Sequence, residues 1–184
     1  MRDEERIRQK RLADRFEIQD VIYRWCRAID RCDWGAMRPL FHDDAVDDHG
    51  LYCGNIDGMI DWLIARHPAI IRCQHSVSNM LIEFAGNDTA LVESHMTACQ
   101  RHRNPESGPS GAAEEYDFVG FGRYVDRFER RDGIWRILKR TVLIETSLRF
   151  PVDPQSANAM PERNWSRRDG CDVIQEERSA LGIV

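Results

Sequence analysis

The hydrophobic pattern of this chain of 184 residues changes its period near residue 70. From Leu12 to Ile29, apolar residues recur three or four positions apart, which is the stripe of an amphipathic helix. Beyond residue 70, segments rich in Val, Ile, Phe, Tyr and Thr alternate with turn signals, as strands do. Helices first and strands afterwards predict an α+β fold, with helices packed on one face of a curved antiparallel sheet.

The turn and capping residues predict the individual elements. The first helix carries the stripe, the second begins after a capping Asp33, and the third begins after a capping Asn55 and ends before Pro68. A short strand is expected within residues 43–50, and long strands at 73–84, 89–103, 116–130 and 134–148. Their short connections favour antiparallel pairing. Prolines and glycines in residues 104–113 predict an exposed loop.

The composition shifts again near Pro151, where prolines follow among polar residues. We therefore expect one domain over residues 1–148 and a C-terminal arm over residues 149–184. The apolar residues of this arm would have little of their own to bury against, so we expect the arm to lie across a neighbouring subunit. These residues are Met160, Trp165, Val173, Ile174, Leu181 and Ile183.

Charge and cysteine usage narrow the function classes. The chain has 26 basic and 31 acidic residues and a net charge of −5, which argues against a nucleic-acid partner because duplex binding needs a concentrated positive surface. It has no run of about eighteen apolar residues and no apolar leader segment, so we expect no membrane partner and a cytoplasmic location. The six cysteines form no C-x-x-C pair, which favours reduced thiols.

Two polar residues occupy places where the pattern expects apolar side chains. Asp30 follows the stripe at the end of the first helix, where the helix dipole disfavours a carboxylate that no cation or donor answers. An exposed helix-end aspartate is the alternative interpretation. His75 is expected to share a strand face with Val77, Asn79 and Leu81. It is either a hydrogen-bonded core residue or a general base.

Arg140 and a histidine-bearing acidic run are further candidates. Either Lys139 or Arg140 must face inward from the last strand, and a buried guanidinium needs an anion. The alternative is pairing with Glu93, Glu129 or Glu145 across the sheet. In the short strand, Asp47 and His49 face the same side, so that His49 could reach a cavity, as could His95. The run lacks the spacing of a calcium loop, and no metal is expected.

Four stretches, in this order, resemble the SnoaL-like family of the nuclear-transport-factor-2-like superfamily. They are residues 18–30 (IQDVIYRWCRAID), 40–45 (LFHDDA), 74–82 (QHSVSNMLI) and 122–140 (GRYVDRFERRDGIWRILKR). The resemblance implies a cone-shaped curved antiparallel sheet, closed by three N-terminal helices around an apolar pocket. It also implies a homo-oligomer, either a dimer or a trimer.

Lyases of this family perform eliminations without a cofactor, using a helix aspartate and a strand histidine. The resemblance places Asp30 and His75 at these two positions and Arg140 at that of a pocket arginine. Five residues before the aspartate, where the family lyases have Lys or Tyr, this chain has Trp25, whose indole can donate a hydrogen bond but not a proton. The acid must then be another residue, or the substrate differs. The candidates are His49, Tyr23, Tyr52, His95 and Tyr124.

The resemblance therefore implies a cofactor-independent lyase acting on a small hydrophobic, aromatic molecule such as a lignin-derived dimer. The expected catalytic residues are Asp30, His75 and Arg140. The expected substrate-binding residues are Trp25, His49, Tyr52, Asn79, His95, Phe118 and Tyr124, with Trp34, Trp62 and Phe121 lining the entry. An isomerase or polyketide-type cyclase with the same base is one alternative. A non-catalytic small subunit or binding module is the other.

Overall fold

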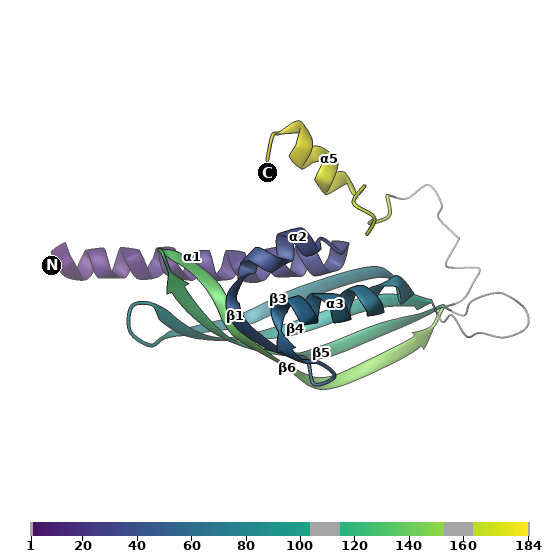
Figure 1. The fold of residues 1–184 in the computed structure, drawn as a ribbon, viewed down its shortest axis with the longest axis horizontal. Coiled ribbons are helices and arrows are strands. Elements are labelled where there is room, and N and C mark those ends of the chain that lie inside the picture. The colour runs from purple at the N-terminus through teal and green to yellow at the C-terminus, as the bar shows by residue number, and fades with distance from the viewer. Residues whose placement is uncertain (1, 104–114, 153–163, 184) are drawn as a thin grey trace, which may run out of the picture.

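The structure, a computed structural model, describes residues 2–103, 115–152 and 164–183 (Figure 1). The expected loop at 104–113 and the arm residue Met160 lie outside these ranges. Within them, no helix is both long enough and apolar enough to cross a bilayer.

Three helices lie in the N-terminal part of the chain, as expected, and the third follows the first two strands of the sheet. They are α1 (Arg2–Arg31), α2 (Trp34–Met37) and α3 (Ile56–Arg66), with 3-10 turns η1 (Arg38–Leu40) and η2 (His67–Ala69) after the last two. Both predicted caps are confirmed: the Asp33 carboxylate accepts the Ala36 N–H at 3.0 Å, and the Asn55 side-chain oxygen accepts the Gly58 N–H at 2.9 Å.

The first helix differs from the predicted stripe at its N-terminal half. It begins at Arg2, well before Leu12, and both Leu12 and Phe16 are exposed. Burial starts with Asp14, a charged residue. The Asp14 carboxylate is buried because it accepts hydrogen bonds from the Trp135 indole at 3.1 Å and from Arg130 at 2.8 Å.

One six-stranded sheet forms the body of the molecule. Its strands run β2-β1-β6-β5-β4-β3, where β1 is Phe41–Asp48, β2 Cys53–Asn55, β3 Ile70–Phe84, β4 Thr89–Arg103, β5 Glu115–Arg131 and β6 Ile134–Pro151. The antiparallel prediction is confirmed for β3 to β6, whereas β1 pairs with β6 in parallel. The α+β fold class is confirmed. In Figure 1 the sheet curves beneath α1, α2 and α3.

The core lies between these helices and the inner face of the sheet. Ile18, Ile22 and Trp25 of α1 are buried against inward side chains such as Val92 and Tyr124. Burial alternates along β4, with Ala90, Val92, Ser94, Met96 and Ala98 buried. The residues between them face the outer side of the sheet, which no described helix covers.

A bulge in β3 overturns one face assignment. The register with β4 shifts between Ser78 and Leu81, and Asn79 adopts a left-handed φ of 47°. The expectation that Asn79 and Leu81 share a face with His75 is therefore wrong. After the bulge, Ile82 is buried instead, and Asn79 and Leu81 are exposed.

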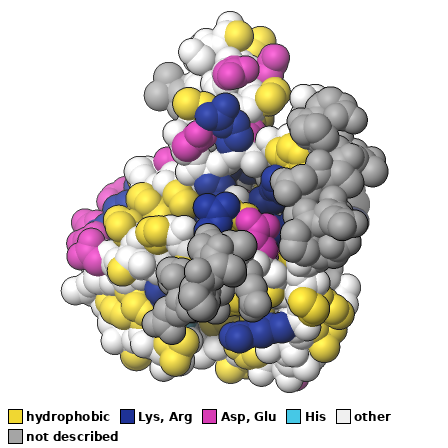
Figure 2. Space-filling view, turned by 90° about the vertical axis from the view of Figure 1, so that its right-hand side faces the viewer, with side chains coloured by type: hydrophobic (Ala, Val, Ile, Leu, Met, Phe, Trp, Pro, Cys, Tyr) yellow, Lys and Arg dark blue, Asp and Glu magenta, His cyan; other side chains and the backbone are white. Residues whose placement is uncertain are grey.

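The described part of the arm packs on its own chain. It ends in helix α5 (Val173–Ala180), which stands apart from the body beyond α2 in Figure 1. The Arg72 guanidinium lies over the Trp165 ring, with its carbon 3.8 Å from the ring centre. Val173, Leu181 and Ile183 are exposed. Figure 2 looks onto this end of the molecule and shows basic side chains where the arm meets the body. Contact with a neighbouring subunit stays a prediction.

Candidate functional site

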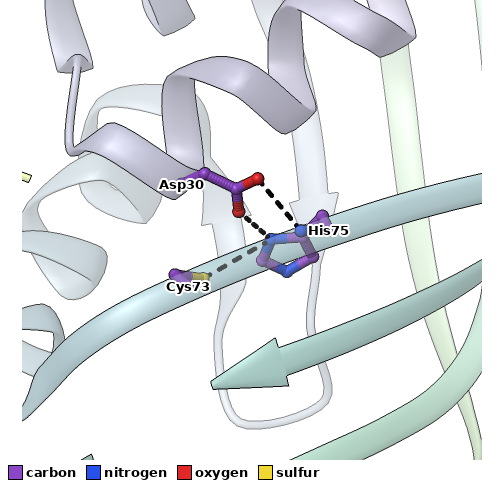
Figure 3. A group of neighbouring side chains, drawn as sticks. All are labelled: Asp30, Cys73 and His75. Carbon is purple, nitrogen blue, oxygen red and sulfur yellow. Dashed lines mark hydrogen bonds and ion pairs between the residues drawn. The ribbon is translucent and has the colours of Figure 1, made fainter. Parts of the chain in front are cut away.

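Asp30 and His75 form a two-point contact between α1 and β3 (Figure 3). The Asp30 Oδ1 atom lies 2.7 Å from His75 Nδ1, and Asp30 Oδ2 accepts the backbone N–H of His75 at 3.0 Å. The two side chains are only 12% and 7% exposed. The carboxylate at the helix end therefore accepts hydrogen bonds from two donors. The alternative interpretation, in which Asp30 is an exposed helix-end aspartate, is wrong.

This contact fixes the protonation pattern of the imidazole. An ionised carboxylate only accepts hydrogen bonds, so Nδ1 must carry the proton that it donates to Asp30. In the neutral ring, Nε2 then holds the lone pair. His75 consequently presents a basic nitrogen on the side of the ring away from Asp30, which is the arrangement of an oriented general base.

An aromatic and cationic stack adjoins the pair. The Trp25 ring meets His75 edge-on at 5.5 Å between centres and Tyr124 at 5.0 Å. The Arg140 guanidinium carbon lies 4.4 Å from the Trp25 ring centre and 4.3 Å from that of Tyr124. Arg140 and Tyr124 come from neighbouring strands, and both are buried with Trp25.

Arg140 is held by Asp126, a partner that the sequence pattern did not identify. Its Nε and Nη2 atoms each donate to one Asp126 oxygen at 2.7 Å, and both side chains are fully buried. Burial opposes the charged form, but the Asp126 carboxylate outweighs it and raises the pKa of Arg140 above its ordinary value. The alternative of pairing with a glutamate is wrong. Glu93 and Glu145 instead accept from Arg123, and Glu129 accepts from Arg131.

Four buried polar atoms in or next to this stack lack a hydrogen-bond partner within the described ranges. They are Arg140 Nη1, Trp25 Nε1, Ser94 Oγ and Asp47 Oδ2, and Asp47 lies opposite Arg140 in the β1–β6 register. Ser94 lies directly opposite Tyr124 in the β4–β5 register, so Arg140, Trp25 and Ser94 surround or adjoin the same ring. The first two atoms can only donate. Buried donors without acceptors are costly, and together they favour an acceptor group on a bound molecule.

A second aspartate–histidine pair lies on β1. Asp47 Oδ1 contacts His49 Nδ1, and the Asp47 side chain is fully buried. Asp47 pairs with Arg140 in the β1–β6 register, which places this pair next to the cationic stack. The His49 ring lies 5.6 Å from that of Trp62, which Tyr52 stacks at 5.9 Å. The Tyr52 hydroxyl itself donates to the Asn55 carbonyl at 2.7 Å.

Cys73 gives the first pair a third potential metal ligand. Its Sγ lies 3.6 Å from His75 Nδ1, and the ligand atoms of Asp30, Cys73 and His75 all lie within 4.8 Å of one another. Burial raises the pKa of the Cys73 thiol well above its ordinary value, which keeps the sulfur protonated. The contacts from Asp30 already hold His75 in place, so the geometry needs no ion to explain it.

The remaining expected residues divide between the two faces of the sheet. Phe118 faces inward, because it lies four positions before the buried Gly122 on the same strand. It pairs with Gln100 of β4, whose side chain contacts Cys73. His95 and Phe121 face outward, and His95 lies 3.2 Å from the Asn79 side chain there. These outward residues are not brought to the Asp30–His75 pair. Tyr23 is exposed, and burial raises the pKa of Tyr124 well above 10, which disfavours proton release from its hydroxyl.

The comparisons with known proteins concern the helices and the sheet. A SnoaL-like domain matches residues 10–141. No curated protein matches the chain. A protein from Novosphingobium aromaticivorans, provisionally named a scytalone dehydratase, is 19% identical with a TM-score of 0.66, covering 79% of this chain and 93% of its own.

Two dehydrochlorinase structures are similar to this chain to about the same degree. Hexachlorocyclohexane dehydrochlorinase LinA-type3 from Novosphingobium barchaimii is 21% identical with a TM-score of 0.65, covering 79% of this chain and 94% of its own. LinA itself is 23% identical with a TM-score of 0.66 and the same coverage. These structures share the nuclear-transport-factor-2-like fold with this chain. Because the family match spans most of the chain, the protein belongs to the SnoaL-like domain family.

Proposed function

We propose that the protein is a cofactor-independent lyase in which His75, oriented by Asp30, removes a proton from a small hydrophobic substrate. The observation that carries this proposal is the two-point contact at 2.7 and 3.0 Å between a carboxylate and a histidine, both largely buried. Contacts to both the ring and the backbone hold the imidazole in one orientation, as an oriented general base requires. Named relatives of the fold, a dehydrochlorinase and a scytalone dehydratase, support elimination as the reaction class.

The elimination itself needs few groups. His75 Nε2 takes the proton from a substrate carbon, and the electron pair of that C–H bond forms the new double bond. The leaving group departs with the electrons of its own bond, as a halide or, after protonation, as water. Where formaldehyde is lost, His75 takes the proton of a hydroxyl instead: the electron pair of the O–H bond forms the C=O bond of formaldehyde, and the pair of the broken C–C bond forms the double bond as the leaving group departs. General-base catalysis of this kind supplies about 10²–10⁴-fold, and positioning in a dry site adds the rest.

The unpartnered donors in the aromatic and cationic stack that adjoins His75 support an acceptor on the substrate. Arg140 Nη1 and Trp25 Nε1 would bind the leaving group or a developing oxyanion, because both are donors only and both are buried. The surrounding Trp25 and Tyr124 rings favour an aromatic or alicyclic body, such as that of a lignin-derived dimer.

The acid that Trp25 cannot supply is assigned to His49. Its ring is oriented by buried Asp47, in the same way that Asp30 orients His75. Asp47 is next to Arg140 in the sheet, so His49 is near the donors that would hold the leaving group. An imidazole can deliver a proton at neutral pH, whereas the indole N–H cannot.

Turnover of a defined panel tests this function. The probes are γ-hexachlorocyclohexane, scytalone and a phenolic 1,2-diarylpropane-1,3-diol, with products followed by mass spectrometry. We expect release of halide, water or formaldehyde from at least one probe, and a loss above about 10²-fold in His75→Gln and Asp30→Asn. His95→Gln, a histidine on the outer face, is the matched control and should retain activity.

Each alternative has its own outcome in this experiment. A product of unchanged mass would replace the lyase by an isomerase or cyclase that uses the same base. Binding without turnover, equal in wild type, His75→Gln and Asp30→Asn, would indicate a binding module and overturn the proposal.

We also propose that the chain is a homo-oligomer, a dimer or trimer assembled through the outer face of the sheet. That face carries the exposed side chains of Leu81, Leu91, Phe121, Leu143, Leu148 and Phe150. Exposed apolar groups gathered on one face are typical of interaction surfaces.

A further inference from the structure

Arg168, in the C-terminal arm, donates hydrogen bonds to both elements that carry the Asp30–His75 pair. Its Nε donates to the Asp30 carbonyl at 2.8 Å, and its Nη2 donates to the Ile29 carbonyl at 3.1 Å. Its Nη1 donates to the carbonyl of Ile70, the first residue of β3, at 2.5 Å. Nη2 also lies 2.6 Å from Nδ1 of His67, in the turn before that strand.

We infer that Arg168 is a positioning residue that fixes the end of α1 against the start of β3, and thereby sets the Asp30–His75 contact. The inference rests on the proposed function and assigns a role to a segment outside the family match at residues 10–141. Arg168 touches neither side chain of the pair. It acts through the backbone of Asp30 itself and of the strand that carries His75.

The physical need for this contact lies at the helix end. The last carbonyls of a helix have no intrahelical donor and carry the negative end of the helix dipole. The Asp30 carboxylate adds a negative charge at the same place. A guanidinium offers a rigid fork of donors and a charge that answers both, whereas a lysine is a single point charge on a flexible stem.

The arm is built to present this side chain. Asp172 accepts the backbone N–H of Arg167 at 2.9 Å and of Ile174 at 3.1 Å, which ties the turn before Arg168 to the start of α5. Asp172 also lies 3.6 Å from Arg31, at the end of α1. These contacts dock the arm on the helix end independently of Arg168 and fix the backbone from which its guanidinium extends.

Substitution of Arg168 in the full-length chain tests the inference. Arg168→Gln removes the fork, and Arg168→Lys keeps the charge alone. The matched control is Arg167→Gln, because the exposed Arg167 guanidinium bonds only Asp169 among the described residues. The substrate-free readout is the Nδ1–H signal of His75 in histidine-labelled protein, identified by its loss in His75→Gln. Urea unfolding verifies that each variant is folded under the conditions of measurement.

We expect the His75 Nδ1–H signal to broaden through faster solvent exchange in Arg168→Gln, to broaden less in Arg168→Lys and to match wild type in Arg167→Gln. On whichever probe the wild type turns over, kcat should fall about 10-fold or more in Arg168→Gln with little change in KM, because a small misplacement weakens a positioned base.

The two proposals fail in different ways. An Arg168→Gln variant that is folded and matches Arg167→Gln in the Nδ1–H signal overturns the positioning role. If Arg168→Gln does not fold, Arg168→Lys decides the question by the same comparison. The signal could broaden in Arg168→Gln while the wild type turns over none of the probes. Arg168 would then still be the residue that sets the Asp30–His75 contact, and the proposed lyase function would be refuted.

Discussion

At the scale of single residues, the buried Arg140–Asp126 pair makes the sharpest prediction about stability. The two side chains are fully buried and form a bidentate ion pair, so removing one charge leaves the other buried without its partner. We expect Asp126→Asn to lower the free energy of unfolding by about 3–5 kcal/mol, measured by urea denaturation.

A double variant distinguishes the cost of an unpaired buried charge from the cost of altered packing at the same place. Asp126→Leu combined with Arg140→Met removes both charges, and its free energy of unfolding should recover most of the loss. A double variant as unstable as Asp126→Asn would show that the cost arises from packing rather than from a stranded charge.

The candidate residues show how far sequence reasoning reaches. Asp30, His75 and Trp25 were predictable, because polar or unusual residues occupied patterned positions within stretches resembling a family. Asp126 was not, although it lies on the same strand face as Tyr124, since the pairing register that brings it opposite Arg140 depends on a bulge in β6. Register shifts are tertiary events that a period of two does not report.

At the scale of elements, the η2 turn predicts a pH dependence of stability. Burial, and then the nearby Arg168 guanidinium, lower the pKa of His67 from 6.5 to about 3. In the unfolded chain His67 binds a proton below pH 6.5, whereas the folded protein leaves it neutral down to about pH 3. Stability is therefore lost as the pH falls through this window, by up to about 1.4 kcal/mol per pH unit from this group.

His67→Asn isolates this contribution. An asparagine oxygen can accept the Arg168 hydrogen bond as Nδ1 does, but it does not titrate. Unfolding free energies measured at about pH 7, 6 and 5 should fall more steeply in wild type than in the variant. Parallel curves for the two proteins would show that His67 takes up no proton on unfolding.

Element types were more predictable than their faces. The caps at Asp33 and Asn55 and the four long strands follow from local sequence, because capping and β-propensity act within a few residues. After the bulge at Asn79, the side chains of β3 that would have faced inward face outward. The sequence signals this bulge only through Asn79 itself, because asparagine tolerates a positive φ. The parallel pairing of β1 with β6 joins segments far apart in the chain.

At the scale of the whole molecule, the order of the motifs predicted the fold, whereas the docking of the arm on its own chain was not predicted. The four resembling stretches end at residue 140, so they carry no information on residues 164–183. The prolines and polar residues there indicated an extension from the body. The docking of Arg168 on α1 depends on carbonyls at a helix end, which every helix has and no sequence motif marks.

The outer face of the sheet makes the prediction about assembly. Phe121, Leu143 and Leu148 on β5 and β6 are exposed there, and no described helix covers them. A second copy of the chain would bury these side chains, with the hydrophobic gain proportional to the apolar area removed from water. By sedimentation velocity we expect wild type to be a dimer or trimer, and Phe121→Glu to dissociate toward monomer, because a charge at the interface centre must be desolvated.

Leu51→Glu is the matched control for this face. Leu51 lies in the turn between β1 and β2 and is more exposed than Phe121, so the same substitution there adds the same charge without touching the outer face. An assembly that survives Phe121→Glu but dissociates in Leu51→Glu would move the interface to the β1–β2 edge. A wild type that sediments as a monomer would refute self-association. It would also mean that the apolar side chains of the outer face are simply tolerated in water, as scattered surface leucines are in many monomers.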